Sequence, residues 1–116
     1  MLRLYGISNC DTVKKARAWL DQHGLDYDFI DIRKNPLQSG VLSQWGYTCG
    51  WDVLVNKRSR TWRELDEADK TNLSAQSAIK LLQTHPTLMK RPVLEINKNN
   101  VLVGFNEKDY CQHLQS

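Results

Sequence analysis

The sequence predicts a single α/β domain in which a β-α-β unit and a β-β-α unit flank a long helical segment. Two observations predict this order. Apolar residues alternate in short runs near both ends of the chain, and they recur at helical spacing between those runs. The chain has 116 residues, of which 41% are hydrophobic, so it is long enough to bury a core without disulfides or metals.

The N-terminal part predicts the β-α-β unit. Residues 2–6 alternate as in a strand, and apolar residues then recur at helical spacing over residues 11–23. Gly24 follows as a typical C-terminal stop for that helix. Alternation over residues 27–32 predicts a second strand, which ends before Pro36.

The middle, residues 37–85, predicts a helical insertion. A helix is expected within residues 37–47, and Ser74 suits the N-cap of another that ends at Pro86. Residues 56–63 are basic and polar and predict a loop.

The C-terminal part predicts a hairpin and a final helix. Residues 92–96 and 101–104 are expected to be its strands, joined by an Asn-rich turn. Asn106 suits the N-cap of the last helix, and Phe105 and Tyr110 have the spacing of a hydrophobic staple.

This order of elements is that of a thioredoxin-like, glutaredoxin-like fold with a mixed four-stranded sheet. Its core is expected to comprise residues 1–36 and 86–116, with residues 37–85 inserted between the two parts.

Charge and hydropathy exclude several classes of function. The 16 basic and 13 acidic residues give a net charge of +3, which is too small to predict a nucleic-acid-binding face. No apolar run approaches the roughly 20 residues that a membrane-spanning helix needs. The N-terminus lacks the pattern of a signal peptide. The sequence therefore predicts a cytoplasmic protein, and we expect a monomer.

Three cysteines stand far apart in the sequence, at Cys10, Cys49 and Cys111. This odd number without a CxxC pair predicts neither a disulfide framework nor a metal site. Cys111 is expected to be a buried structural thiol on the core face of the last helix. Cys49 lies in a turn, and a role as a resolving cysteine stays open but is the less favoured interpretation.

Cys10 is the candidate nucleophile because it stands where a strand passes into a helix. Unpaired backbone N–H groups and the positive end of the helix dipole favour a thiolate there, and thiolate is the reactive form. Lys14 and Lys15 add positive charge within the next turn and a half, and the Thr12 hydroxyl is placed to donate a hydrogen bond to the sulfur. The negative charge of Asp11 opposes this stabilisation of the thiolate.

Several segments in the same order resemble one known family. They are residues 4–16 (LYGISNCDTVKKA), 57–65 (KRSRTWREL), 85–86 (HP), 90–93 (KRPV) and 103–105 (VGF). The sequence is similar to the arsenate reductase (ArsC)/Spx-like family over nearly its whole length. It most resembles the YffB-type branch, whose members are described as thiol reductases.

The resemblance implies roles for particular residues. Cys10 would be the catalytic cysteine, Pro92 the cis-proline that faces it, and Arg91 one of the arginines that hold the oxyanion in arsenate reductases. The expected substrate-binding residues are Asn9, Thr12, Lys14, Arg58, Arg60, Arg91 and Pro92.

Two departures from the family pattern change the expected chemistry. The positions of the other two oxyanion-binding arginines hold Asn56 and Gly104, with Arg58 and Arg60 nearby as substitutes. Val13 occupies the position of the second cysteine of the Spx-type CxxC switch. We therefore expect a glutathione-dependent thiol reductase that forms a mixed disulfide at Cys10. Glutathione would be the co-substrate, no cofactor would stay bound, and glutaredoxin is a further candidate partner.

Two alternatives remain open at this stage. The first is a non-enzymatic regulator of the Spx type that binds the RNA polymerase alpha subunit through the basic insertion. The second is a true arsenate reductase.

Overall fold

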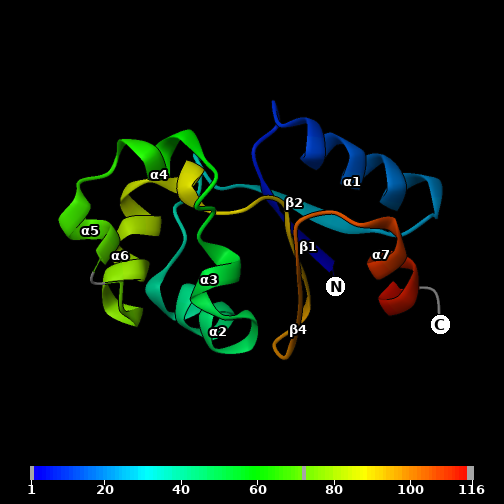
Figure 1. Cartoon of the computed structure of the whole chain (residues 1–116). Coiled ribbons are helices and arrows are strands. Elements are labelled where there is room, and N and C mark those ends of the chain that lie inside the picture. The colour runs from blue at the N-terminus through cyan, green and yellow to red at the C-terminus, as the bar shows by residue number, and fades with distance from the viewer. Residues whose placement is uncertain (1, 72, 115–116) are drawn as a thin grey trace. The chain divides into compact units, whose positions relative to one another are not determined.

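The structure is a computed structural model that describes residues 2–71 and 73–114 (Figure 1). The chain forms two compact units. Unit 1 consists of Met1–Asn35 together with Arg91–Ser116, and unit 2 consists of Pro36–Lys90. Unit 1 therefore takes its residues from both ends of the chain.

Unit 1 contains a mixed four-stranded sheet with the order β2-β1-β3-β4. Strand β1 pairs in parallel with β2 and antiparallel with β3, and β3 pairs antiparallel with β4. This sheet confirms the predicted fold class. The strands are β1 (Leu2–Gly6), β2 (Tyr27–Asp31), β3 (Val93–Asn97) and β4 (Asn100–Val103).

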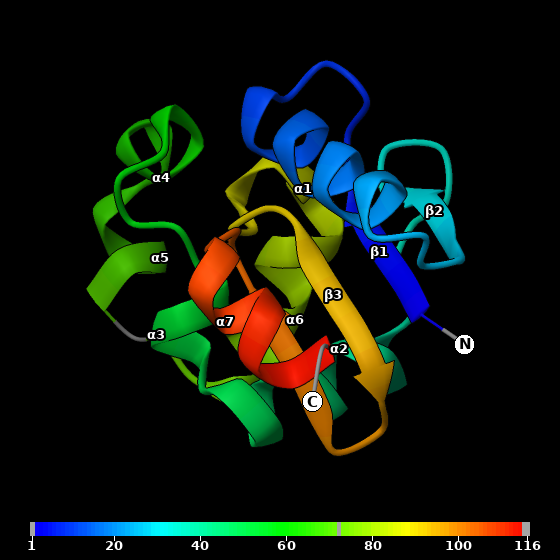
Figure 2. The ribbon, with the colours of Figure 1, turned by 90° about the vertical axis from the view of Figure 1, so that its right-hand side faces the viewer.

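Helices α1 (Asp11–Gln22) and α7 (Glu107–Leu114) lie over the same face of this sheet, in front of the strands in Figure 2. They enclose the core of unit 1. Its buried side chains are Leu4, Ala16, Trp19, Leu20, Leu94 and Tyr110.

Tyr110 forms the centre of the contact between α1 and α7. Its ring meets Trp19 edge to face at 5.4 Å between centroids, and meets Phe105 in the same way at 4.9 Å. The second contact confirms the predicted staple. The Tyr110 hydroxyl is buried and forms no hydrogen bond with any other described residue, and burial raises the pKa of Tyr110.

Replacing Tyr110 by phenylalanine is expected to stabilise the protein by about 1 kcal/mol, because the change removes a buried polar atom that lacks a partner. The aromatic ring and its two edge-to-face contacts are kept. Urea unfolding of the two proteins measures the difference. A loss of stability in Tyr110→Phe would show that the hydroxyl does find a partner in solution.

Unit 2 is helical. Its elements are α2 (Ser39–Cys49), α3 (Trp51–Leu54), α4 (Arg60–Glu64), α5 (Glu67–Thr71), α6 (Ala75–Thr84) and a 3-10 turn (Pro86–Leu88). Leu42, Trp45, Leu54, Leu82 and Leu88 are among its buried side chains. Within the described parts of the chain, no helix is long and apolar enough to cross a membrane.

The caps of unit 2 confirm one prediction and correct another. Ser74 caps α6, where it forms a reciprocal capping box with Ser77. The predicted loop at residues 56–63 is wrong in its second half, because α4 starts there. Ser59 caps this helix by accepting a hydrogen bond from the backbone N–H of Trp62 at 3.1 Å. The sequence analysis did not recognise Ser59 as an N-cap residue because basic residues surround it.

Candidate active site

Cys10 is the N-cap residue of α1. Its backbone is extended, with φ −99° and ψ 125°, and its side chain is partly exposed. The Cys10 N–H donates to the Ile7 carbonyl at 3.3 Å, and its carbonyl accepts from the Lys14 N–H at 2.9 Å. These two hydrogen bonds fix the backbone of Cys10 at the junction between β1 and α1, as the sequence predicts.

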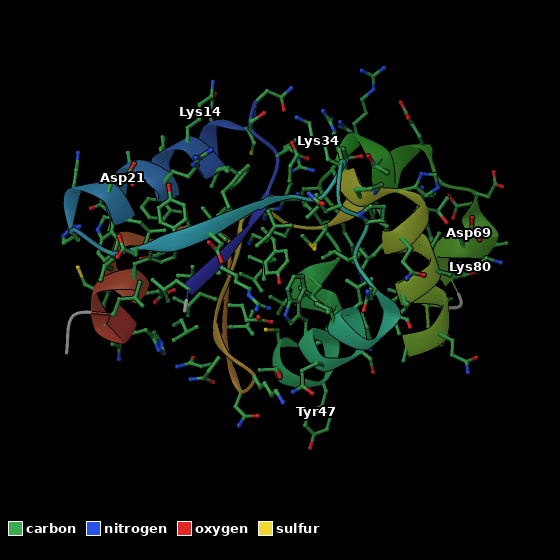
Figure 3. All side chains as sticks on the ribbon, turned by 180° about the vertical axis from the view of Figure 1, so that it is seen from behind. Lys14, Asp21, Lys34, Tyr47, Asp69 and Lys80 are labelled. Carbon is green, nitrogen blue, oxygen red and sulfur yellow. The ribbon has the colours of Figure 1, made fainter. Side chains whose placement is uncertain are left out.

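The first turn of α1 and Lys14 place positive charge on the side of the helix N-terminus where Cys10 lies. The backbone N–H groups of the first turn of α1 have no acceptor within the helix, and they lie at the positive end of its dipole. Lys14 is exposed and extends from α1 into solvent, so it contributes charge at a distance (Figure 3). The cysteine side chain makes no capping hydrogen bond.

The peptide bond between Arg91 and Pro92 is cis, as the family resemblance implies. Strands β1 and β3 are antiparallel with Tyr5 opposite Val93, so the residues after Tyr5 lie at the same end of the sheet as those before Val93. The β1–α1 junction with Cys10 and the cis-proline are therefore brought to one end of unit 1. The Gly104 N–H donates to the Pro92 carbonyl at 2.8 Å and ties this bend to the end of β4.

The structure places the two polar neighbours of Cys10 in different settings. Asn9 is exposed in the turn that follows β1. Thr12 forms no hydrogen bond with the Cys10 sulfur among the described residues, contrary to expectation. Its side chain instead lines a groove on α1 that also contains Lys15.

Of the three predicted site arginines, Arg91 belongs to unit 1, whereas Arg58 and Arg60 belong to unit 2. Arg91 is partly exposed and its Nε is buried. Arg60 Nε lies 2.9 Å from the Glu64 carboxylate, so its guanidinium already has an anionic partner. Arg58 is exposed, and its backbone N–H donates to the Asn56 side chain at 3.1 Å.

The other two cysteines, Cys49 and Cys111, differ in how far they are buried. Burial raises the pKa of Cys49, which is partly buried at the end of α2. Cys111 is exposed on α7, so the prediction of a buried structural thiol is wrong. Tyr110 takes the buried face of this short helix, and the next residue points about 100° away from it. All three cysteines are free thiols.

The comparison with known families identifies the chain. The model of the ArsC family matches residues 5–113, almost the whole length. The chain belongs to the ArsC family. This membership confirms the resemblance and the thioredoxin-like fold class.

Three similar proteins illustrate the relatives of this ArsC-family chain. The structure of a protein named YFFB is 42% identical, covers 98% of this chain and 99% of its own, and superposes with a TM-score of 0.94. An arsenate reductase (ArsC) related protein from Brucella melitensis is 40% identical over 99% of this chain and 95% of its own, with a TM-score of 0.76. The global transcriptional regulator Spx of Listeria innocua is 32% identical over 98% of this chain and 87% of its own.

Sequence reasoning about the ArsC-family site missed the groove beside α1. Trp19 and Phe105 line it together with Lys15 and Glu107. These residues come from the two ends of the chain, so no local spacing relates them. The only available signal is the helical face of α1, on which residues 12, 15, 19 and 22 lie together.

Proposed function

We propose that this chain is a thiol–disulfide oxidoreductase that acts through Cys10, with glutathione as the second thiol. The observation that supports it is the place of Cys10 at the N-terminus of α1, partly exposed and at the same end of the sheet as the cis-proline Pro92. In this proposal the substrate meets Asn9, Thr12, Lys14 and Arg91 around the sulfur. A reducing cytosol is the compartment that suits this chemistry.

The proposed reaction has three exchange steps. The Cys10 thiolate attacks one sulfur of a disulfide, a mixed disulfide forms, and the other sulfur leaves as a thiolate that takes a proton. A glutathione thiolate then attacks the mixed disulfide and releases either the second substrate thiol or Cys10. A second glutathione completes the cycle, so one disulfide is reduced to two thiols and two glutathiones become one glutathione disulfide.

The external thiol is needed because α1 offers no second sulfur. Val13 occupies the position that the second cysteine of a CxxC motif would take, and its side chain is fully buried. Cys111 is exposed on α7, and Cys49 belongs to unit 2. A second thiol from solution therefore resolves the mixed disulfide in this mechanism.

Alkylation by iodoacetamide at neutral pH is expected to modify Cys10 first, Cys111 second and Cys49 last. Exposure alone would place Cys111 first, so a rate at Cys10 about tenfold higher indicates stabilisation of its thiolate. Cys49 is slow because its raised pKa leaves less thiolate at neutral pH. Mass spectrometry of the three peptides over time gives the rates. Slower modification of Cys10 than of Cys111 would remove the support for a catalytic Cys10.

A second candidate function is regulation of transcription. The observation that favours it is the 32% identity to the Spx regulator over 98% of this chain. In that case the exposed basic residues of unit 2, such as Lys57, Arg58 and Arg63, would dock on the RNA polymerase alpha subunit. A pull-down with purified alpha subunit tests this: retention that Arg58→Ala abolishes supports the regulator, and no retention supports the reductase.

Arsenate reduction is the third candidate, favoured by the 40% identity to an ArsC-related protein. Asn56 and Gly104 oppose it, because neither supplies the guanidinium that holds an oxyanion bidentately. Gly104 also has φ 80°, a conformation that side-chain-bearing residues rarely adopt. Oxidation of glutathione that depends on arsenate, in the presence of glutaredoxin, would support this activity.

A further inference from the structure

A groove of about 650 Å³ runs along the outer face of α1, between this helix and the segment that enters α7. Its apolar side is formed by Trp19 and Phe105, and its polar side chains come from Thr12, Lys15, Gln22 and Glu107. All of these residues belong to unit 1. The groove is therefore a feature of one compact unit.

The groove carries two opposite charges that do not neutralise each other. Lys15 comes from α1 and Glu107 from the first turn of α7, and both are exposed. Neither forms an ion pair with another described residue, whereas other exposed charges of the chain do pair, as Arg60 does with Glu64 at 2.9 Å. A ligand with both an ammonium and a carboxylate can therefore pair with both residues at once.

The floor and walls of the groove are held in place by contacts of their own. The Tyr110 ring packs edge to face against both Trp19 and Phe105. The Asn106 side chain accepts a hydrogen bond from the Lys108 N–H at 2.9 Å, which caps α7 and fixes the helical turn that carries Glu107. The groove is thus a preorganised surface, which lowers the entropic cost of binding.

One end of the groove is lined by a residue close in sequence to the proposed nucleophile. Thr12 lies two residues after Cys10, and Lys15 lies about 7.5 Å further along the helix axis than Cys10 at 1.5 Å per residue. In glutathione the thiol is on the central residue, and eight bonds separate its sulfur from the α-carboxylate carbon of the γ-glutamyl residue, a reach of roughly 10 Å when extended. The γ-glutamyl arm of a glutathione bonded to Cys10 is therefore long enough to cover the axial rise to Lys15.

We infer that this groove binds the zwitterionic γ-glutamyl end of glutathione while its sulfur reacts at Cys10, an inference that rests on the proposed function. The α-carboxylate pairs with Lys15, the α-ammonium pairs with Glu107, and the two methylene groups lie over Phe105, because Trp19 is almost fully buried. An ordinary peptide does not carry both charges on one carbon atom. A phosphate or arsenate dianion is repelled by Glu107.

Binding can be measured apart from redox chemistry by NMR titration of the full chain with S-methylglutathione, which has no free thiol. We expect amide shifts along α1 and at the start of α7. Lys15→Met and Glu107→Gln should each weaken binding about fivefold, as expected for the loss of a partly exposed ion pair. S-methylcysteinylglycine, which lacks the γ-glutamyl group, should bind more weakly than S-methylglutathione.

Matched controls come from α7. Lys108→Met and Asp109→Asn make the same changes of charge on this helix outside the groove, and they should leave the affinity unchanged. The inference is overturned if Lys15→Met and Glu107→Gln bind S-methylglutathione as tightly as the unmodified chain. It is also overturned if the dipeptide analogue binds equally well.

The experiments distinguish an error in the inference about the groove from an error in the proposed function. If exchange with glutathione disulfide needs Cys10 but its KM is unchanged in Lys15→Met and Glu107→Gln, the groove is wrong and the reductase stands. If S-methylglutathione binds through Lys15 and Glu107 but Cys10→Ser exchanges disulfides as well as the unmodified chain, the reductase is wrong and the binding site stands.

Discussion

Replacing Cys10 by serine is expected to abolish exchange with glutathione disulfide, with a loss of about a thousandfold or more, because a serine hydroxyl does not form the mixed disulfide. The same change should leave the fold intact. Cys10 is the N-cap of α1 and its side chain makes no capping hydrogen bond, whereas serine is among the best N-cap residues. We therefore expect Cys10→Ser to be more stable than the unmodified chain by about 0.5–1 kcal/mol.

Two measurements check this pair of effects. A coupled assay of glutathione oxidation gives the activity, and urea unfolding gives the stability. Cys49→Ser and Cys111→Ser serve as matched controls that change a thiol to a hydroxyl elsewhere, and both should remain active. Activity that survives in Cys10→Ser, or that is lost in Cys49→Ser, would assign the nucleophile to another residue.

Replacing Gly46 by alanine is expected to destabilise unit 2 by about 1–3 kcal/mol, the usual cost of overpacking a filled core. Gly46 is buried in the middle of α2, and a Cβ atom built there runs into the indole of Trp51. The clash involves a bulky ring at the start of α3 rather than the free end of a flexible side chain. Relief therefore requires that the whole ring move.

Gly40 provides the matched control, because it lies in the same helix and a Cβ atom built there has no neighbour within 4 Å. Gly40→Ala should be neutral or stabilising by up to about 1 kcal/mol, as expected for glycine in a helix. Urea unfolding of both variants gives the comparison. Adding Trp51→Leu to Gly46→Ala should recover part of the loss, and equal stabilities of the two alanine variants would contradict the proposed clash.

The strands and helices of unit 1 follow from local signals in the sequence. Alternation predicts β1 over residues 2–6, and the structure has the same bounds. The Asn106 cap and the contact of Phe105 with Tyr110 are also local, because all three residues lie within one turn of the start of α7. Such elements can be predicted because the residues that define them are close in sequence.

The features that sequence reasoning missed depend on contacts with residues that are distant in the sequence or on which helix face is buried. Helix α4 has only five residues and no buried side chain, and Thr61 holds it through a 2.7 Å hydrogen bond to the distant Thr87. Exposure of Cys111 depends on which face of α7 turns to the core, and Tyr110 decides that face. The place of Cys10 at a strand–helix junction was predictable, whereas the groove was not, because its two walls come from opposite ends of the chain.

The division of unit 1 between the two ends of the chain has a consequence for its synthesis. Strand β3 lies between β1 and β4 in the sheet, yet it is translated after all of Pro36–Lys90. At 5–20 residues per second, the ribosome takes roughly 3–10 s to make that segment. Throughout this interval the nascent chain carries β1 with one unpaired edge, a surface that invites pairing with other chains. The order of synthesis therefore leaves this edge of β1 without its native partner until the last quarter of the chain is made.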